Sequence, residues 1–149
     1  ADSGLVARVL RPVTRVIVGS PAYLAAHGRP DRPEALTGHA CLLYRNMPVA
    51  DQWRFATPDG TRQFRGPERL RADNGTVMLG AAIAGLGLAE LPDFIVSNAL
   101  ADGRLELLLP DHRLQTAALR LVYPPAGRLS AKVRALADFL TDHFAGTPA

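Results

Sequence analysis

The stretch Gly85-Leu86-Gly87 restricts the fold more than any other part of the sequence, because it stands between a helix pattern and a strand pattern. The residues before it, 75–84, are apolar nearly all round and predict a fully buried helix, while 86–92 reads as a strand. A nucleotide-binding glycine turn needs the reverse order, with the helix N-terminus facing the phosphates. We therefore interpret Gly85 as a left-handed helix terminator and Gly87 as a point of close packing, and expect no nucleotide site.

Strand-like and helix-like segments alternate along most of the chain. This alternation is typical of α/β folds, in which helices flank a mainly parallel sheet. The turn Pro58-Asp59-Gly60 lies between two short, half-exposed runs and predicts one β-hairpin insertion. The expected strands are 13–19, 40–44, 86–92, 104–110 and 117–125, and the expected helices are 21–27, 75–84, 93–101 and 130–144. The expected N-caps are Ser20, Asp31 (in a capping box with Glu34), Asn74 and Ser130.

The length of 149 residues suffices for one ordinary globular core and favours one compact unit. The formal net charge of +3 comes from scattered arginines, since Lys132 is the only lysine. A nucleic-acid binder concentrates such charge on one face, so we do not expect this chain itself to bind DNA. The sequence has no apolar run of membrane-spanning length and no secretory signal, which favours a cytoplasmic protein with no membrane partner.

The reactive side chains form no recognisable catalytic or metal-binding constellation in the sequence. Cys41 lies in an apolar run and is expected to be a buried, inert thiol. The histidines stand near the ends of elements, where we expect them to be exposed, and their spacing fits no metal site. Glu90 is an acid within an apolar strand, for which the sequence offers no explanation. We therefore expect no metal, no cofactor and no enzyme activity. The histidines are His27, His39, His112 and His143.

Two segments fall at the carboxyl ends of expected strands, where open α/β sheets collect their ligands. One is the loop Tyr44–Pro48, and the other is Asn74-Gly75-Thr76 at the start of the expected buried helix. The helix start offers unpaired backbone N–H groups and the positive end of the helix dipole, which suit a small carboxylate or a phenolic compound. An equally good interpretation of Asn74 is that it only caps the helix.

Five phrases follow one another in a characteristic order: VIVGSPAYLAAHGRPDRPEALTGHACLLY, WRF, LRADNGTVMLGAAIAGLGLAELPDFIV, ADGRLELLLP and LVYPPAGRLSAKVRALADFL. Together they resemble the effector-binding domain of LysR-type bacterial transcriptional regulators over almost the whole chain. The resemblance implies a two-lobed fold similar to type 2 periplasmic binding proteins, with a small effector between the lobes. The effector contacts that it implies are Tyr44, Arg45, Asn46, Asn74, Gly75 and Thr76.

The resemblance also implies a domain organisation. Residues 1–17 would be a remnant of lobe one with a crossing strand, residues 18–117 would be lobe two, and residues 118–149 would be the return strand and C-terminal helix of lobe one. The first part of lobe one would be absent. DNA would be bound only through a helix-turn-helix domain that this chain does not contain.

With part of lobe one absent, the apolar faces of the segment LVARVL and of the last helix would lack a cover. We therefore expect the chain to self-associate, as a dimer or a higher oligomer, and to bind its effector poorly. The alternative function is that of a solute-binding receptor of a transport system with the same bilobal fold. A third and less favoured function is that of a lyase or transferase with this fold. The helix face in question comprises Val133, Leu136, Ala137, Leu140 and Phe144.

Overall fold

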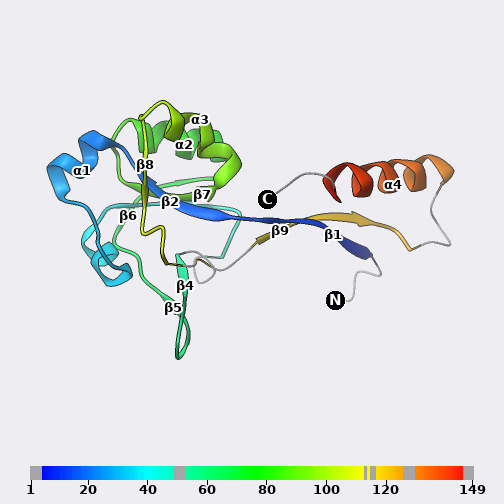
Figure 1. Ribbon diagram of the computed structural model, residues 1–149, viewed down its shortest axis with the longest axis horizontal. Coiled ribbons are helices and arrows are strands. Elements are labelled where there is room, and N and C mark those ends of the chain that lie inside the picture. The colour runs from blue at the N-terminus through cyan, green and yellow to red at the C-terminus, as the bar shows by residue number, and fades with distance from the viewer. Residues whose placement is uncertain (1–4, 49–52, 113, 115–116, 126–129, 146–149) are drawn as a thin grey trace. The chain divides into compact units, whose positions relative to one another are not determined.

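The computed structural model (Figure 1) describes residues 5–48, 53–112, 114, 117–125 and 130–145. The chain divides into two compact units: Arg15–Gln115 forms the larger, and Ala1–Thr14 with Thr116–Ala149 forms the smaller. Chain length favoured a single unit, but the two ends of the chain pair with each other and not with the central sheet. Among the described residues, no helix is both long and apolar enough to cross a membrane.

The larger unit is built around five strands: β2 (Arg15–Gly19), β3 (Cys41–Tyr44), β6 (Glu68–Ala72), β7 (Leu88–Pro92) and β8 (Glu106–Leu108). Their order in the sheet is β6-β3-β7-β2-β8. β3 is parallel to both β6 and β7, whereas β2 is antiparallel to both β7 and β8. Four strands thus point one way and β2 points the other. The expected α/β fold with mainly parallel strands is confirmed, in the form of a mixed sheet.

Successive side chains of a strand point to opposite faces of a sheet. In this sheet each face is covered by its own buried cluster. In β3, Cys41 and Leu43 belong to one buried cluster and Leu42 to the other. The first cluster draws on α1 (Pro21–His27), the 3-10 helix η1 (Pro33–Gly38) and β4 (Arg54–Thr57), which forms a hairpin with β5 (Gly60–Gln63). The second cluster draws on α2 (Gly75–Ile83) and α3 (Asp93–Ala101).

The glycines between α2 and β7 have the structural roles expected of them. Gly85 has a φ of +78°, the left-handed conformation that ends a helix, and the amide of Leu86 donates to the carbonyl of Ala81 at 3.0 Å. Gly87 passes so close to the preceding segment that a Cβ there would lie 2.5 Å from the carbonyl oxygen of Ala40. Because the order is helix, glycine, strand, the helix end beside these glycines is the negative one.

The expectations for Asp31 and for α2 are wrong. Asp31 does not begin a capping box: η1 follows Arg32, which makes no side-chain capping bond, and the turn is 3-10 in form. α2 is not fully buried either, since only Met78, Ala81 and Ala82 are buried and Val77 remains 54% exposed. An almost wholly apolar composition does not reveal that only one face of a helix is covered.

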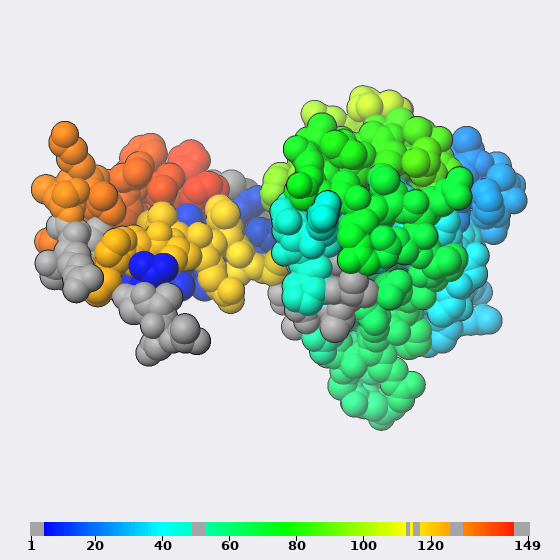
Figure 2. Space-filling model, turned by 180° about the vertical axis from the view of Figure 1, so that it is seen from behind, coloured from blue at the N-terminus to red at the C-terminus, as the bar shows by residue number. Residues whose placement is uncertain are grey.

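The smaller unit consists of an antiparallel pair, β1 (Val6–Val13) and β9 (Ala117–Tyr123), and of α4 (Ala131–Ala145), which packs against β1. The apolar face of α4 was expected to lack a cover, and its residues Val133 and Leu136 are 40% and 56% exposed, whereas Ala137 on the same face is buried. This unit therefore carries much of the exposed apolar surface of the described residues. Figure 2 shows its elements in space-filling form, with β9 and α4 in yellow to red. Its exposed large apolar side chains are Leu5, Val6, Val9, Leu119, Val122, Val133, Leu136 and Phe139.

Candidate functional site

The parallel pairing of β3 with β6 brings the two expected ligand-binding segments together. Tyr44 stands opposite Ala72 in the register, and just beyond it the amide of Arg45 donates to the Ala72 carbonyl at 2.7 Å. The side-chain amide of Asn46 then donates to the carbonyl of Asp73 at 3.5 Å. The loop after β3 therefore runs beside the chain that enters α2, at the carboxyl edge of the sheet.

Asn74 caps α2 through its side chain. Its Oδ1 accepts a 2.7 Å hydrogen bond from the amide of Thr76, and its carbonyl accepts the first helical bond from Met78. The expected capping role of Asn74 is thus confirmed, and the other N–H groups of the first turn remain as donors that a ligand could use. Asn74 and Thr76 are exposed and Gly75 is partly buried.

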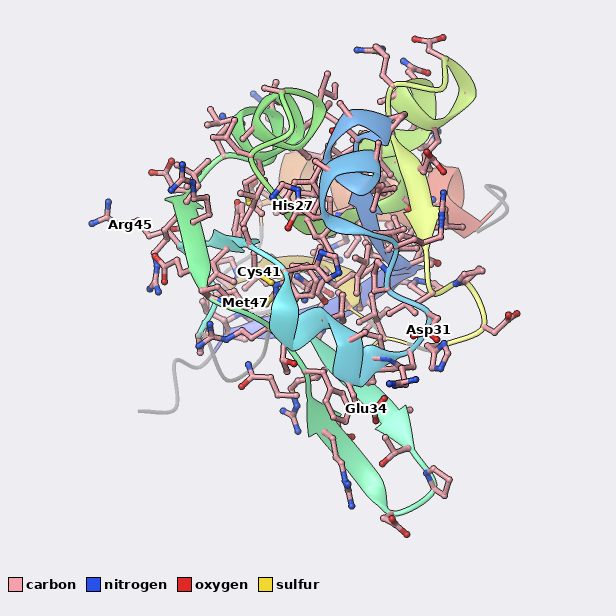
Figure 3. All side chains as sticks on the ribbon, turned by 90° about the vertical axis from the view of Figure 1, so that its left-hand side faces the viewer. His27, Asp31, Glu34, Cys41, Arg45 and Met47 are labelled. Carbon is pink, nitrogen blue, oxygen red and sulfur yellow. The ribbon has the colours of Figure 1, made fainter. Side chains whose placement is uncertain are left out.

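The loop side chains of this site differ in their surroundings. Tyr44 is partly buried and packs on the cluster beneath α2, whereas Arg45 and Asn46 are exposed. Arg45 points outward from the protein (Figure 3), and its guanidinium has no partner among the described residues. The described part of this edge therefore offers the guanidinium of Arg45, backbone amide donors and the ring of Tyr44.

A cavity of about 550 Å³ lies at the opposite edge of the sheet, where β3, β6 and β7 begin. Tyr23 and His27 stack in its wall with ring centroids 4.3 Å apart, and the Tyr23 hydroxyl accepts a hydrogen bond from the amide of Ala40. Sequence reasoning did not anticipate this cavity, although the spacing of Tyr23 and His27 on one helix face was visible. Its lining residues are Tyr23, His27, Ala40, Pro67, Glu68, Arg69, Gly85 and Leu86.

One histidine departs from the expected exposure. His39 is only 7% exposed, and its Nδ1 lies 3.4 Å from the hydroxyl of Tyr23. Burial lowers the pKa of His39, and the nearby His27 lowers it further. His27 and His112 are exposed, as expected. The local sequence around His39 gave no sign of burial, because the cover comes from Tyr23 in another element.

Cys41 is fully buried, as expected. Burial raises the pKa of its thiol to about 11, although the amide of Gly66, 3.3 Å from Sγ, opposes the shift. A thiol that is both inaccessible and protonated is a poor nucleophile. Within the described ranges, no three His, Cys, Asp or Glu side chains are grouped so that they could hold a metal ion.

Glu90, which the sequence left unexplained, is the centre of a buried network. Its Oε1 lies 3.3 Å from Nη1 of Arg15, and its Oε2 accepts a 2.6 Å hydrogen bond from the amide of Trp53. The same Nη1 lies 3.2 Å from Sδ of Met47, in the loop after β3. Neither Arg15 nor Trp53 could be assigned as a partner from the sequence, since each stands far from Glu90 in the chain.

Comparison with known proteins gives a consistent result. The pattern of the LysR substrate binding domain family matches residues 1–145. A Haemophilus influenzae protein described as an uncharacterized HTH-type transcriptional regulator is 35% identical over 132 residues, which are 89% of this chain and 46% of the relative. The HTH-type transcriptional regulator CrgA of Neisseria meningitidis is 32% identical over 142 residues, 95% of this chain and 47% of CrgA.

The solved structure of the CrgA regulatory domain from Neisseria meningitidis superposes with a TM-score of 0.79 at 31% identity. The match covers 96% of this chain and 70% of that domain. This chain thus spans about half the length of the curated relatives it matches and about two thirds of the regulatory domain.

Proposed function

The chain belongs to the LysR substrate binding domain family, and we propose that it senses a small organic anion at the carboxyl edge of its five-stranded sheet. The ligand would contact the loop residues Tyr44, Arg45 and Asn46 and the helix start Asn74, Gly75 and Thr76. The hydrogen bond from the Arg45 amide to the Ala72 carbonyl is the observation that carries the proposal, because it joins the two segments into one surface.

The chemistry of this edge supports an anionic ligand. The exposed guanidinium of Arg45 can form two parallel hydrogen bonds with a carboxylate. The first turn of α2 adds N–H donors and the positive end of the helix dipole. The ring of Tyr44, partly exposed beside these donors, favours an anion with an aromatic or otherwise apolar body.

The wider role that we propose is regulatory. The relatives with assigned names are transcriptional regulators, which supports sensing without chemical transformation of the ligand. Residues 18–117 would form lobe two, and 1–17 with 118–149 would contribute to lobe one, an assignment that the division of the chain at Thr14 and Thr116 supports. Ligand occupancy would reach DNA, in the cytoplasm, through self-association and a helix-turn-helix domain.

Heteronuclear NMR on this chain tests the ligand site, since it detects binding even at millimolar dissociation constants. Benzoate, phenylacetate, succinate and glutarate would be titrated to about 10 mM, where a millimolar complex is largely saturated. We expect at least one of them to shift the amide resonances of Arg45, Asn46, Gly75 and Thr76 together. Benzamide, which has the shape of benzoate without its charge, is the matched control and should shift them much less.

Two outcomes would contradict the proposal. One is the absence of shifts at both segments with every carboxylate. The other is a shift pattern confined to the cavity at the amino edge, around Tyr23 and Leu86, which would place the ligand at the opposite end of the strands.

A further inference from the structure

Glu90 lies in the middle of β7, the central strand of the sheet, and its side chain is 2% exposed. Its register partner in β2 is Ile17, so the carboxylate stands in an otherwise apolar layer. The Arg15 side chain that faces it is 8% exposed. Charged side chains are almost never buried this deeply unless they are paired. Packing alone therefore does not explain why two charged side chains are buried at this position.

Three parts of the larger unit meet at this pair. Arg15 begins β2, Met47 belongs to the loop after β3, and Trp53 precedes β4. Arg15 contacts the sulfur of Met47, and Glu90 accepts the hydrogen bond from the Trp53 amide. Met47 directly follows the three loop residues of the proposed site. The pair thus attaches the loop at Met47 to strands β2 and β7, and it also holds Trp53, which comes six residues later in the chain.

The backbone of Trp53 shows why an anchor is needed at this point. Its φ is +57°, in the left-handed region that bulky residues rarely occupy, and its side chain is fully buried. Such a conformation persists only where surrounding contacts enforce it. The Glu90 carboxylate provides one of these contacts by accepting from the Trp53 N–H at 2.6 Å.

Stability alone does not account for the pair. Burial raises the pKa of Glu90 above its usual range, although the charge of Arg15 and the hydrogen bond from Trp53 both act to lower it. The cost of removing the charged carboxylate from water thus exceeds the stabilisation that Arg15 and the Trp53 amide give it. Buried pairs of this kind are often replaceable by apolar side chains without loss of stability. What apolar side chains could not reproduce is the directed bonding to Met47 and Trp53.

We propose that Arg15 and Glu90 are positioning residues of the ligand site. The buried pair fixes Met47 and Trp53, and through them the conformation of Tyr44, Arg45 and Asn46, without touching the ligand itself. This inference rests on the function proposed above, because it concerns the affinity of that same site.

The test compares the wild-type chain with the double variant R15M/E90L, which removes both charges while keeping side chains of similar size. Trp53 is the only tryptophan, so quenching of its fluorescence by acrylamide reports on this anchor without any ligand. We expect a quenching constant raised about threefold or more, because local opening exposes the indole. We also expect an unfolding temperature within about 4 °C of wild type, and about tenfold weaker binding of the carboxylate that gave shifts in the wild-type chain.

The matched control is E106Q, because Glu106 also pairs with an arginine, Arg29, but on an exposed part of the same unit. It should leave quenching and binding unchanged. The second variant is E90Q, which keeps the side-chain volume and one oxygen for the Trp53 amide but loses the charge. If R15M/E90L does not fold, E90Q should still fold with faster hydrogen exchange at the Met47 amide and weaker binding.

Unchanged Trp53 quenching in R15M/E90L would overturn the inference, as would raised quenching with wild-type affinity for the carboxylate. If neither R15M/E90L nor E90Q folds, the pair is a requirement of the fold and the inference is also overturned. Failure of the proposed function appears separately, as the absence of carboxylate shifts in the wild-type chain, and the ligand-free quenching and exchange then decide alone whether the pair fixes the loop.

Discussion

The Glu90 carboxylate and the Arg15 guanidinium approach each other to 3.3 Å, between Oε1 and Nη1, and both side chains lie almost entirely out of water. An ionisable group in such surroundings links the stability of the fold to pH, because its pKa differs between the folded and unfolded chain.

The free energy of unfolding should carry a Glu90 contribution that decreases as the pH rises. Burial raises the folded pKa of Glu90 above its ordinary value of 4.5, so the folded chain holds this proton more tightly than the unfolded chain. The contribution is therefore complete below pH 4.5 and is lost as the pH rises through the raised folded pKa. Urea unfolding of wild type and E90Q from about pH 4 to 8 should show the stability difference shifting in favour of E90Q as the pH rises. A constant difference would contradict the prediction.

The contribution of His39 to the free energy of unfolding should instead increase as the pH rises. Burial lowers its folded pKa below 6.5, so the unfolded chain takes up the proton first. Its contribution to stability is present above pH 6.5 and is lost as the pH falls through the lowered folded pKa. In H39Q, unfolding in urea should lack this acid-side loss. H112Q, in which an exposed histidine is replaced, is the control and should keep the wild-type profile.

The Cys41 thiol should resist alkylation in the native chain. With its pKa raised to about 11, the thiolate fraction at pH 8 is small, and the side chain is inaccessible. The rate of modification by iodoacetamide, followed by mass spectrometry, should be about 100-fold lower or more in buffer than in concentrated urea. Cys41 is the only cysteine, so a single modified species reports on it. Equal rates in the two conditions would contradict its burial.

Gly87→Ala should destabilise the larger unit by about 2 kcal/mol, because the new Cβ would overlap the Ala40 carbonyl and force the backbone to shift. Gly80→Ala is the matched control: it lies in α2, where a Cβ meets nothing within 4 Å. This change should leave stability unchanged or raise it by up to about 1 kcal/mol, since alanine favours helix. Urea unfolding measures the free energy of unfolding of both variants. An unchanged free energy in Gly87→Ala would contradict the close approach of Gly87 to the Ala40 carbonyl.

Two substitutions of Asn74 should separate its cap from its proposed role at the ligand site. Asn74→Ala removes the bond to the Thr76 amide and should cost about 1 kcal/mol of stability. Asn74→Asp keeps a capping oxygen and should retain stability, while its negative charge should repel a carboxylate and weaken binding about tenfold. Wild-type binding of carboxylates by Asn74→Asp would indicate that this residue is only a cap.

The chain should be a dimer or larger at tens of micromolar, because the smaller unit exposes several large apolar side chains. Phe139, 63% exposed on α4, is the largest of them, and Phe139→Glu should shift the mass from light scattering toward the monomer. Leu107→Glu places the same charge on the larger unit and should leave the mass from light scattering unchanged. A monomeric wild-type chain would contradict this prediction.

Much of the fold could be predicted from short stretches of sequence. Ser20, Asn74 and Gly85 begin or end their helices through bonds to residues within a few positions, so their roles are visible locally. The antiparallel direction of β2 was not visible, because a strand pattern carries no direction. The partial exposure of α2 was missed for a related reason, since composition does not say how many sides of a helix are covered.

For the candidate site, the sequence determined which segments end strands or begin helices, and so which residues could offer donors to a ligand. Only the tertiary structure decided that these segments meet, because the pairing of β3 with β6 joins residues far apart in the chain, such as Asn46 and Asp73. The same holds for Glu90, whose partners Arg15 and Trp53 come from other strands and loops. Caps and turns depend on bonds between near neighbours, whereas charge compensation and shared surfaces depend on long-range packing that no local pattern records.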